Sequence, residues 1–158
     1  MANWENSDGL KVQFGPQDVR NVGITSATKK RMEALIDLTD PIGFTHDLDN
    51  DGTNDGYAED AFLPAGAYIT DAYLIVNTAA AGGTSINVGL YQADGTVIDA
   101  DGIDAAVLTA AMAANKAVAC DGALVGGTDT VGANDAYLFV AATGTFTAGE
   151  VKLVVEYY

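Results

Sequence analysis

Apolar residues recur at every second position in two segments of the chain. In the first segment these positions are Met32, Ala34, Ile36 and Leu38. In the second, at the end of the chain, they are Val151, Leu153, Val155 and Tyr157. Successive side chains of a β-strand point to opposite faces, so this period of two predicts two strands that each bury one face.

Further apolar segments are separated by turns that contain glycine. Segments 67–78 and 84–92 flank Gly82 and Gly83, and we expect them to pair as a β-hairpin. Segments 136–142 and 150–158 predict a second hairpin in the same way. An Asp-Gly turn at 94–95 predicts that the chain reverses there into a strand at 96–98.

Segment 104–114 is different, because it is rich in alanine and its larger apolar residues recur at helical spacing. Alanine favours the helix more than any other residue, so this segment predicts one short helix. Asp101 or Asp104 would cap its start, and Asn115 would end it. The face expected to pack on the core consists of Val107, Leu108, Ala111 and Met112.

These elements together predict an all-β protein with one short helix. Seven or eight short strands separated by turns, in a chain with 18 glycines, are typical of an antiparallel β-sandwich, and a jelly roll is the topology we expect. Residues 32–158 would form this single domain, and residues 1–31 an extended N-terminal arm.

Charge is distributed unevenly along the chain. There are 22 acidic and 7 basic residues, for a formal net charge of −15. Residues 1–31 have a net charge of +2, whereas residues 32–158 have a net charge of −17. Because nucleic-acid binding depends on Lys and Arg against phosphates, this composition argues against a nucleic-acid partner, and it disfavours an anionic membrane surface. We expect neither a signal peptide nor a transmembrane helix.

The N-terminal arm contains five of the seven basic residues. Residues 10–14 predict one short strand, and residues 16–31 predict an extended segment that reaches roughly 50 Å at about 3.3 Å per residue. Such an arm would cross its own domain or reach a neighbouring subunit; a mobile terminus, or a strand returned to the same sheet, are the alternatives. The residues expected to bind a partner are Lys11, Arg20, Lys29, Lys30 and Arg31.

Residues 47–60 contain six carboxylates and no basic residue. Acids at alternate positions followed by Gly52 in sixth place resemble the start of an EF-hand or thrombospondin-type calcium loop. The end departs from that pattern, because Ala58 stands where a bidentate Glu is usual. The candidate ligands of a bound Ca²⁺ are Asp47, Asp49, Asp51, Asp55 and Glu59. The alternative is a solvated acidic loop, and no cofactor is required for folding.

Few residues are suited to covalent catalysis. The chain has one histidine, His46, which we expect at the surface, and one cysteine, Cys120, which we expect in the core. None of the three serines lies in a nucleophile elbow. A hydrolase that uses two carboxylates is a remote alternative, and we expect no enzymatic activity.

Segments 62–76, 98–106, 119–126 and 145–157 together resemble the small structural proteins encoded near the capsid gene of tailed bacteriophages, notably marine and cyanobacterial phages. The resemblance implies a head decoration (cement) protein on the outer surface of the virion, a homotrimer that clamps neighbouring major capsid subunits and has no catalytic site. The alternative function, suggested by the acidic segment, is a calcium-dependent carbohydrate-binding or adhesin β-sandwich.

Overall fold

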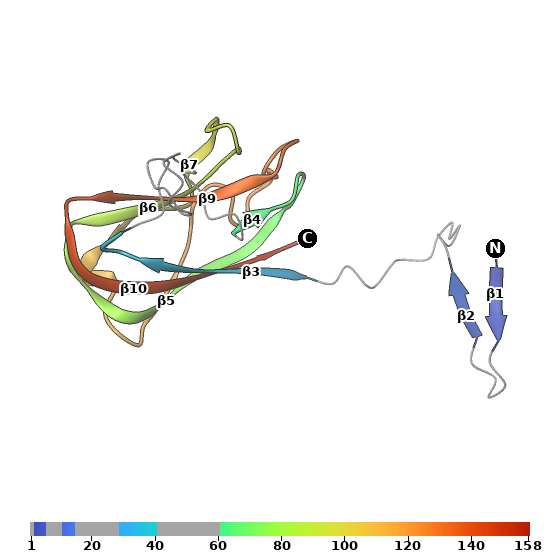
Figure 1. Ribbon diagram of the computed structural model, residues 1–158, viewed down its shortest axis with the longest axis horizontal. Coiled ribbons are helices and arrows are strands. Elements are labelled where there is room, and N and C mark those ends of the chain that lie inside the picture. The colour runs from blue at the N-terminus through green and yellow to red at the C-terminus, as the bar shows by residue number, and fades with distance from the viewer. Residues whose placement is uncertain (1, 6–10, 15–28, 41–60) are drawn as a thin grey trace, which may run out of the picture.

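The computed structural model describes residues 2–5, 11–14, 29–40 and 61–158 (Figure 1). Apart from one turn of 3-10 helix, η1 (Thr109–Ala111), all its regular elements are strands. In chain order the strands are β1 (Ala2–Glu5), β2 (Lys11–Phe14), β3 (Lys30–Asp37), β4 (Phe62–Leu63), β5 (Ile69–Gly82), β6 (Ser85–Tyr91), β7 (Val97–Leu108), β8 (Ala117–Ala119), β9 (Ala136–Thr143) and β10 (Phe146–Tyr157).

Eight of these strands form two four-stranded antiparallel sheets that pack face to face. The strand orders are β3-β10-β5-β8 and β4-β9-β6-β7. The pairs β3 with β10, β4 with β9, β5 with β8 and β6 with β7 join the first of the eight strands to the last, the second to the seventh, and so on inward. This is the pattern of one long hairpin wound around a core, which is a jelly roll. The predicted all-β sandwich is confirmed.

The core lies between the two sheets. Its side chains come from alternate positions of β3, β5, β6, β9 and β10, and the largest include Ile36, Leu74, Ile86, Leu138 and Leu153, all of them buried. The alternation predicted at both segments is confirmed, since Met32, Ala34, Ile36 and Leu38 are buried, as are Val151, Leu153 and Val155. Tyr157, the last residue of the predicted pattern, is partly buried against the core. Val154 points to the opposite face of β10 and is nevertheless buried.

The two predicted hairpins are wrong. β5 and β6 lie in different sheets, and so do β9 and β10. The turns between them cross from one sheet to the other at the same end of the sandwich, on the left in Figure 1. The turn after β5 depends on Gly83, which has a φ of 43° and where a Cβ atom would lie 2.4 Å from the Phe146 ring. The hairpin of β6 and β7 across the 94–95 turn is confirmed.

The predicted helix over 104–114 is reduced to the single turn of 3-10 helix η1 (Thr109–Ala111), and its first half is strand instead. β7 continues to Leu108 because its residues pair with β6, with Val107 opposite Ile86, and this pairing outweighs the helix propensity of alanine. A bulge at Ala106, whose φ is 53° and whose N–H donates to Asn87 Oδ1, interrupts the register. Val107 and Met112 are buried as expected, whereas Leu108 and Ala111 are exposed.

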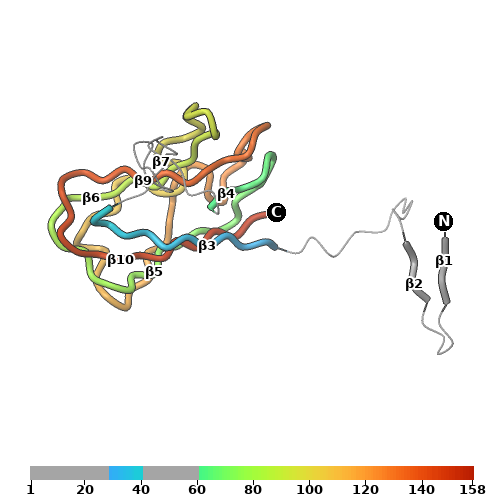
Figure 2. The backbone as a smooth tube through the Cα atoms, viewed as in Figure 1, coloured from blue at the N-terminus to red at the C-terminus, as the bar shows by residue number. Residues whose placement is uncertain are grey.

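The N-terminal strands β1 and β2 form a two-stranded antiparallel sheet of their own, in which Lys11 lies opposite Glu5. β2 corresponds to the strand predicted at 10–14. In the sandwich, β3 begins at Lys30, so that Lys30 and Arg31 belong to a strand, which Figure 2 traces beside the C-terminal strand.

Candidate functional site

Two of the three basic residues at positions 29–31 make ion pairs within their own subunit. Lys29 Nζ donates to Glu156 Oε2 at 2.7 Å, and this bond raises the pKa of Lys29. Arg31 pairs with Glu33, whose other carboxylate oxygen accepts from Lys152 Nζ at 2.8 Å. The bond from Lys152 is the main reason that the pKa of Glu33 is lowered.

Lys30 lies between Lys29 and Arg31 and is exposed, as they are. Within the part of the chain that the structure describes, no ion pair involves it. Surface ion pairs contribute little to stability and exchange readily, so Lys29 and Arg31 can release their acids to another partner. Of the other predicted partner-binding residues, Lys11 lies in β2 and Arg20 lies outside the described residues.

β3 is the edge strand of its sheet, paired with β10 on one side only among the described strands. It is eight residues long, and it therefore presents a row of backbone N–H and C=O groups that an extended segment can join. Leu35, on its outward face, is 58% exposed. The edge of β3 is thus suited to strand pairing with another chain.

The predicted calcium ligands, Asp47, Asp49, Asp51, Asp55 and Glu59, and the histidine His46 lie outside the described residues. In residues 29–40 and 61–158, no group of three or more His, Cys, Asp or Glu side chains is placed to hold a metal ion. The calcium site therefore stays a prediction.

A buried polar pair, which the sequence did not predict as a pair, lies where β7 passes the segment after β8. The Cys120 thiol donates a hydrogen bond to the Asp104 carboxylate, and both residues are buried. Burial raises the pKa of both groups. A thiol held protonated in this way is a poor nucleophile, which agrees with the core position expected for Cys120.

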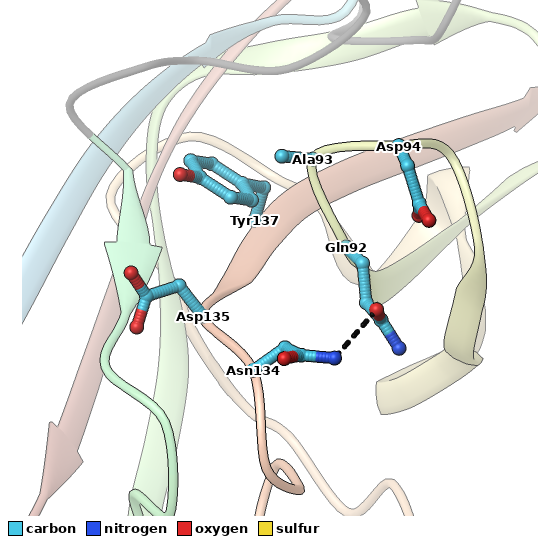
Figure 3. Close-up of a pocket in the computed structure, with 6 residues that line it drawn as sticks. All are labelled: Gln92, Ala93, Asp94, Asn134, Asp135 and Tyr137. Carbon is cyan, nitrogen blue, oxygen red and sulfur yellow. Dashed lines mark hydrogen bonds between the residues drawn. The ribbon is translucent and has the colours of Figure 1, made fainter.

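A surface hollow of about 400 Å³ lies at the end of the second sheet, where the β6–β7 turn meets the start of β9 (Figure 3). Its lining consists of Gln92, Ala93, Asp94, Asn134, Asp135 and Tyr137. Figure 3 shows the Gln92 and Asn134 side chains meeting, and Asn134 Nδ2 donates to Gln92 Oε1 at 2.8 Å. Sequence reasoning missed this hollow, because its two halves are some forty positions apart and only the Asp-Gly turn carried a local signal.

The carboxylates of the hollow are held by backbone N–H groups. Asp94 Oδ1 accepts from the Thr96 N–H at 2.9 Å, and Asp135 Oδ1 accepts from the Ala65 N–H at 2.9 Å. The Thr96 N–H is also the main reason that the pKa of Asp94 is lowered. The Asp94 carboxylate is therefore ionised and fixed in place at neutral pH.

An aromatic pair adjoins the hollow. Phe62 on β4 lies opposite Tyr137 on β9, and their ring centroids are 6.0 Å apart at an interplanar angle of 34°. Phe62 is 42% exposed, although large apolar side chains are usually covered. The hollow thus combines an aromatic side with fixed amide and carboxylate groups.

Among the described residues, no helix is long enough and apolar enough to cross a bilayer.

The sandwich formed by β3 to β10 is an eight-stranded jelly roll. No protein family model matches the sequence, and no curated protein is significantly similar to it. Among solved structures, the chain is similar to one in the capsid asymmetric unit of cyanophage Pam1, with a TM-score of 0.55 and 18% identity over 92% of this chain and 96% of that chain. It is also similar to a chain in the capsid of Ralstonia phage GP4, with a TM-score of 0.52 and 16% identity over 92% and 90% of the two chains. The chain therefore has the fold of two proteins found in phage capsid structures.

Proposed function

We propose that this protein is a structural component of a tailed-phage virion, which binds the outer surface of the capsid as a decoration protein and stabilises contacts between major capsid subunits. The observation that carries the proposal is the fold shared with chains of two phage capsids over nine-tenths of the length. The four segments that resemble phage structural proteins support it independently.

The physical character of the chain suits this role. A jelly roll with a continuous core is a rigid block, and a net charge of −15 keeps copies displayed at high density from adhering to other particles. The edge of β3, which no other described strand pairs with, offers a place for an extended segment of a neighbouring subunit. The role requires no catalytic residues, and we propose that the protein is not an enzyme.

The basic residues Lys11, Arg20, Lys29, Lys30 and Arg31 would contact acidic edges of the major capsid protein. On binding, Lys29 and Arg31 would exchange Glu156 and Glu33 for capsid carboxylates, while Lys30 has no ion pair within the described residues to give up. Binding of this kind weakens as salt concentration rises, because exposed charges are screened.

Co-sedimentation tests the proposal directly. Purified protein is mixed with phage shells that lack it, the shells are pelleted, and bound protein is measured against added protein at several salt concentrations. Saturable binding is expected; no binding at any salt concentration contradicts the proposal.

Two variants locate the contact. Lys30→Glu is expected to weaken shell binding at least several-fold, whereas Lys116→Glu, an exposed lysine in another part of the sandwich, controls for net charge. A chain that lacks residues 1–28 keeps β3 intact, and it is expected to lose shell binding while it retains its urea midpoint. If both Lys30→Glu and this truncated chain bind as the wild type does, the arm is not the contact.

The homotrimer is tested separately by light scattering of the free protein. A mass of three chains is expected. A strict monomer at all concentrations contradicts the trimer, and the co-sedimentation result then decides the capsid role alone.

A further inference from the structure

We propose that the outer face of the sheet β3-β10-β5-β8 binds the β1–β2 hairpin of a second copy of this chain. The inference rests on the proposed function in one respect, because it names the contact through which the homotrimer would assemble. It is tested without capsid shells, so the contact can fail while shell binding succeeds, and the reverse.

Two neighbouring rows of residues on this outer face are mostly apolar. β10 contributes Lys152 to one row and Val154 to the next, and β3, β5 and β8 supply the residues beside them. The outward face of an antiparallel sheet that covers a core is usually polar. Here the apolar positions are contiguous, and we call them the apolar strip: Leu35, Val154, Tyr73, Ile75, Ala117 and Ala119.

The apolar strip is accessible along most of its length. Leu35 at the β3 edge is 58% exposed, and both alanines of β8 are exposed. Tyr73 and Ile75 on β5 are partly exposed, whereas Val154 on β10 is buried. A partner that lies on the strip can therefore bury apolar surface from three strands of the sheet.

Polar residues surround the apolar strip. At one end Glu156 lies between Arg31 and Asp71 in the strand register, and at the other end Glu150 lies opposite Asp37. An exposed apolar patch with a polar rim is typical of a surface that contacts another protein.

The two polar residues within the rows are paired with each other. Lys152 Nζ donates to Glu33 Oε2 at 2.8 Å. An apolar partner on the strip can leave this ion pair at its margin and does not separate the two charges.

The β1–β2 hairpin has a complementary character. Trp4 lies opposite Val12 and Ala2 opposite Phe14, and these apolar positions alternate with polar ones, so they share one face of the two strands. Among the described strands, β1 and β2 pair only with each other. A two-stranded hairpin is at best marginally stable in water, and it is stabilised when its apolar face packs against another element. The strip provides such a surface.

The dimensions of the two elements agree. Each strand of the hairpin has four residues and is about 13 Å long, at about 3.3 Å per residue. The apolar strip crosses four strands whose axes are about 4.8 Å apart, so it is about 14 Å long. The hairpin can therefore lie along the strip with its strands across those of the sheet, as in orthogonal sheet packing.

The hairpin that binds the strip comes from a neighbouring copy. The chain leaves its own strip accessible, as the exposure of Leu35 shows. Residues 15–29 separate β2 from β3 and reach at most about 50 Å when extended, which is enough to bridge to an adjacent subunit. A contact between two different surfaces closes into a ring when each copy gives its hairpin to the next, and a homotrimer is such a ring.

Trp4 reports on this contact, because it is the only tryptophan in the sequence and belongs to the apolar face of the hairpin. Its fluorescence is recorded on the full-length protein over a range of concentrations, and the mass of the same samples is measured by light scattering. The emission is expected at shorter wavelength in samples whose mass exceeds one chain, because the bound hairpin buries the indole. A monomer with the same short-wavelength emission overturns the proposal, as does an associated protein whose Trp4 emits as in water.

Two variants test the two sides of the contact. Leu35→Glu on the strip and Val12→Asp on the hairpin each bring a charge into the apolar contact, and each is expected to weaken association at least about tenfold and to abolish the emission shift. Leu108→Glu is the matched control, because Leu108 is 56% exposed and lies in the other sheet; it is expected to change neither property.

Urea unfolding of these variants shows that the fold is intact. Below the Kd of association Leu35 is exposed to solvent, so the urea midpoint of the separated subunit is expected to stay close to that of the wild type. If Leu35→Glu and Val12→Asp associate as the wild type does, or if Leu108→Glu weakens association as much as they do, the proposal is wrong.

The measured mass also separates this contact from the trimer. A mass of two chains with the shifted Trp4 emission contradicts the homotrimer but supports the contact, because two copies can exchange hairpins reciprocally. A mass of three chains that Leu35→Glu does not change supports the homotrimer and contradicts the contact.

Discussion

Asp104 and Cys120 are 16 positions apart in the chain, and their side chains are joined by a hydrogen bond inside the sandwich, where the residues are 5% and 6% exposed. The carboxylate accepts and the thiol donates. Burial of Asp104 is the main reason that its pKa is raised.

The raised pKa of Asp104 gives this group a predictable effect on stability. The folded protein holds the Asp104 proton at pH values where the unfolded chain, with an ordinary pKa of 3.8, has released it. The contribution of this group to the free energy of unfolding is therefore fully present below pH 3.8 and is lost as the pH rises through the folded pKa.

Asp104→Asn removes this titration, because an amide does not ionise. Relative to the wild type, the variant is expected to become more stable as the pH is raised from about 4 to 7, whatever its absolute stability. Urea midpoints of both proteins at several pH values measure the difference, in which the other carboxylates cancel. If the difference between the two urea midpoints stays constant with pH, the raised pKa does not belong to Asp104.

The core between the sheets is expected to respond strongly to truncation of Leu153. This residue is fully buried on β10, where it lies between Leu74 and Ala34 in neighbouring strands. Leu153→Ala is expected to lower the free energy of unfolding by about 2–5 kcal/mol. Leu35→Ala, in the same sheet but exposed, is expected to change it by less than about 0.5 kcal/mol. Urea unfolding measures both, and equal losses would mean that Leu153 does not lie in the core.

Gly89 is expected to tolerate no side chain. It lies in the middle of β6, where a Cβ atom would be 2.2 Å from the Ala100 carbonyl oxygen of β7. Gly89→Ala must displace the backbone of β7, and we expect a loss of about 3 kcal/mol. Gly66→Ala is the control, because it has open space and only a φ of 76° to oppose it, at about 1 kcal/mol. The close approach of β7 is refuted if chemical denaturation finds Gly89→Ala to be the less damaging of the two.

Because of the acidic segment 47–60, we predict that the thermal stability of the protein depends on calcium. If Asp47, Asp49, Asp51, Asp55 and Glu59 bind Ca²⁺, the Tm should be several degrees higher in CaCl₂ than in a chelator, because a ligand that binds only the folded state stabilises it. The double variant Asp49→Asn and Asp51→Asn should remove the difference, and Asp129→Asn, elsewhere on the chain, should preserve it. If the Tm of the wild type is the same in CaCl₂ and in chelator, the calcium prediction is wrong and the segment is a solvated acidic loop.

The sequence by itself determined the strand character of most of this protein and which side of β3 and of β10 faces the core. The alternation at Met32–Leu38 and at Val151–Val155 is a local property, because the direction of each side chain depends only on its position along the strand. The sequence also identified the turn at 94–95, since Asp-Gly favours a tight reversal within four residues.

Only the tertiary structure decided which strands pair, how residues 104–108 are folded, and where the hollow lies. The partners in a jelly roll are distant in sequence, so β5 pairs with β10 and β8 rather than with the adjacent β6. The same non-local pairing holds an alanine-rich segment in β7 against its helix propensity, and it brings residues 92–94 beside 134–137. Local pattern cannot encode these contacts, because their free energy arises only when segments far apart in the chain are brought together.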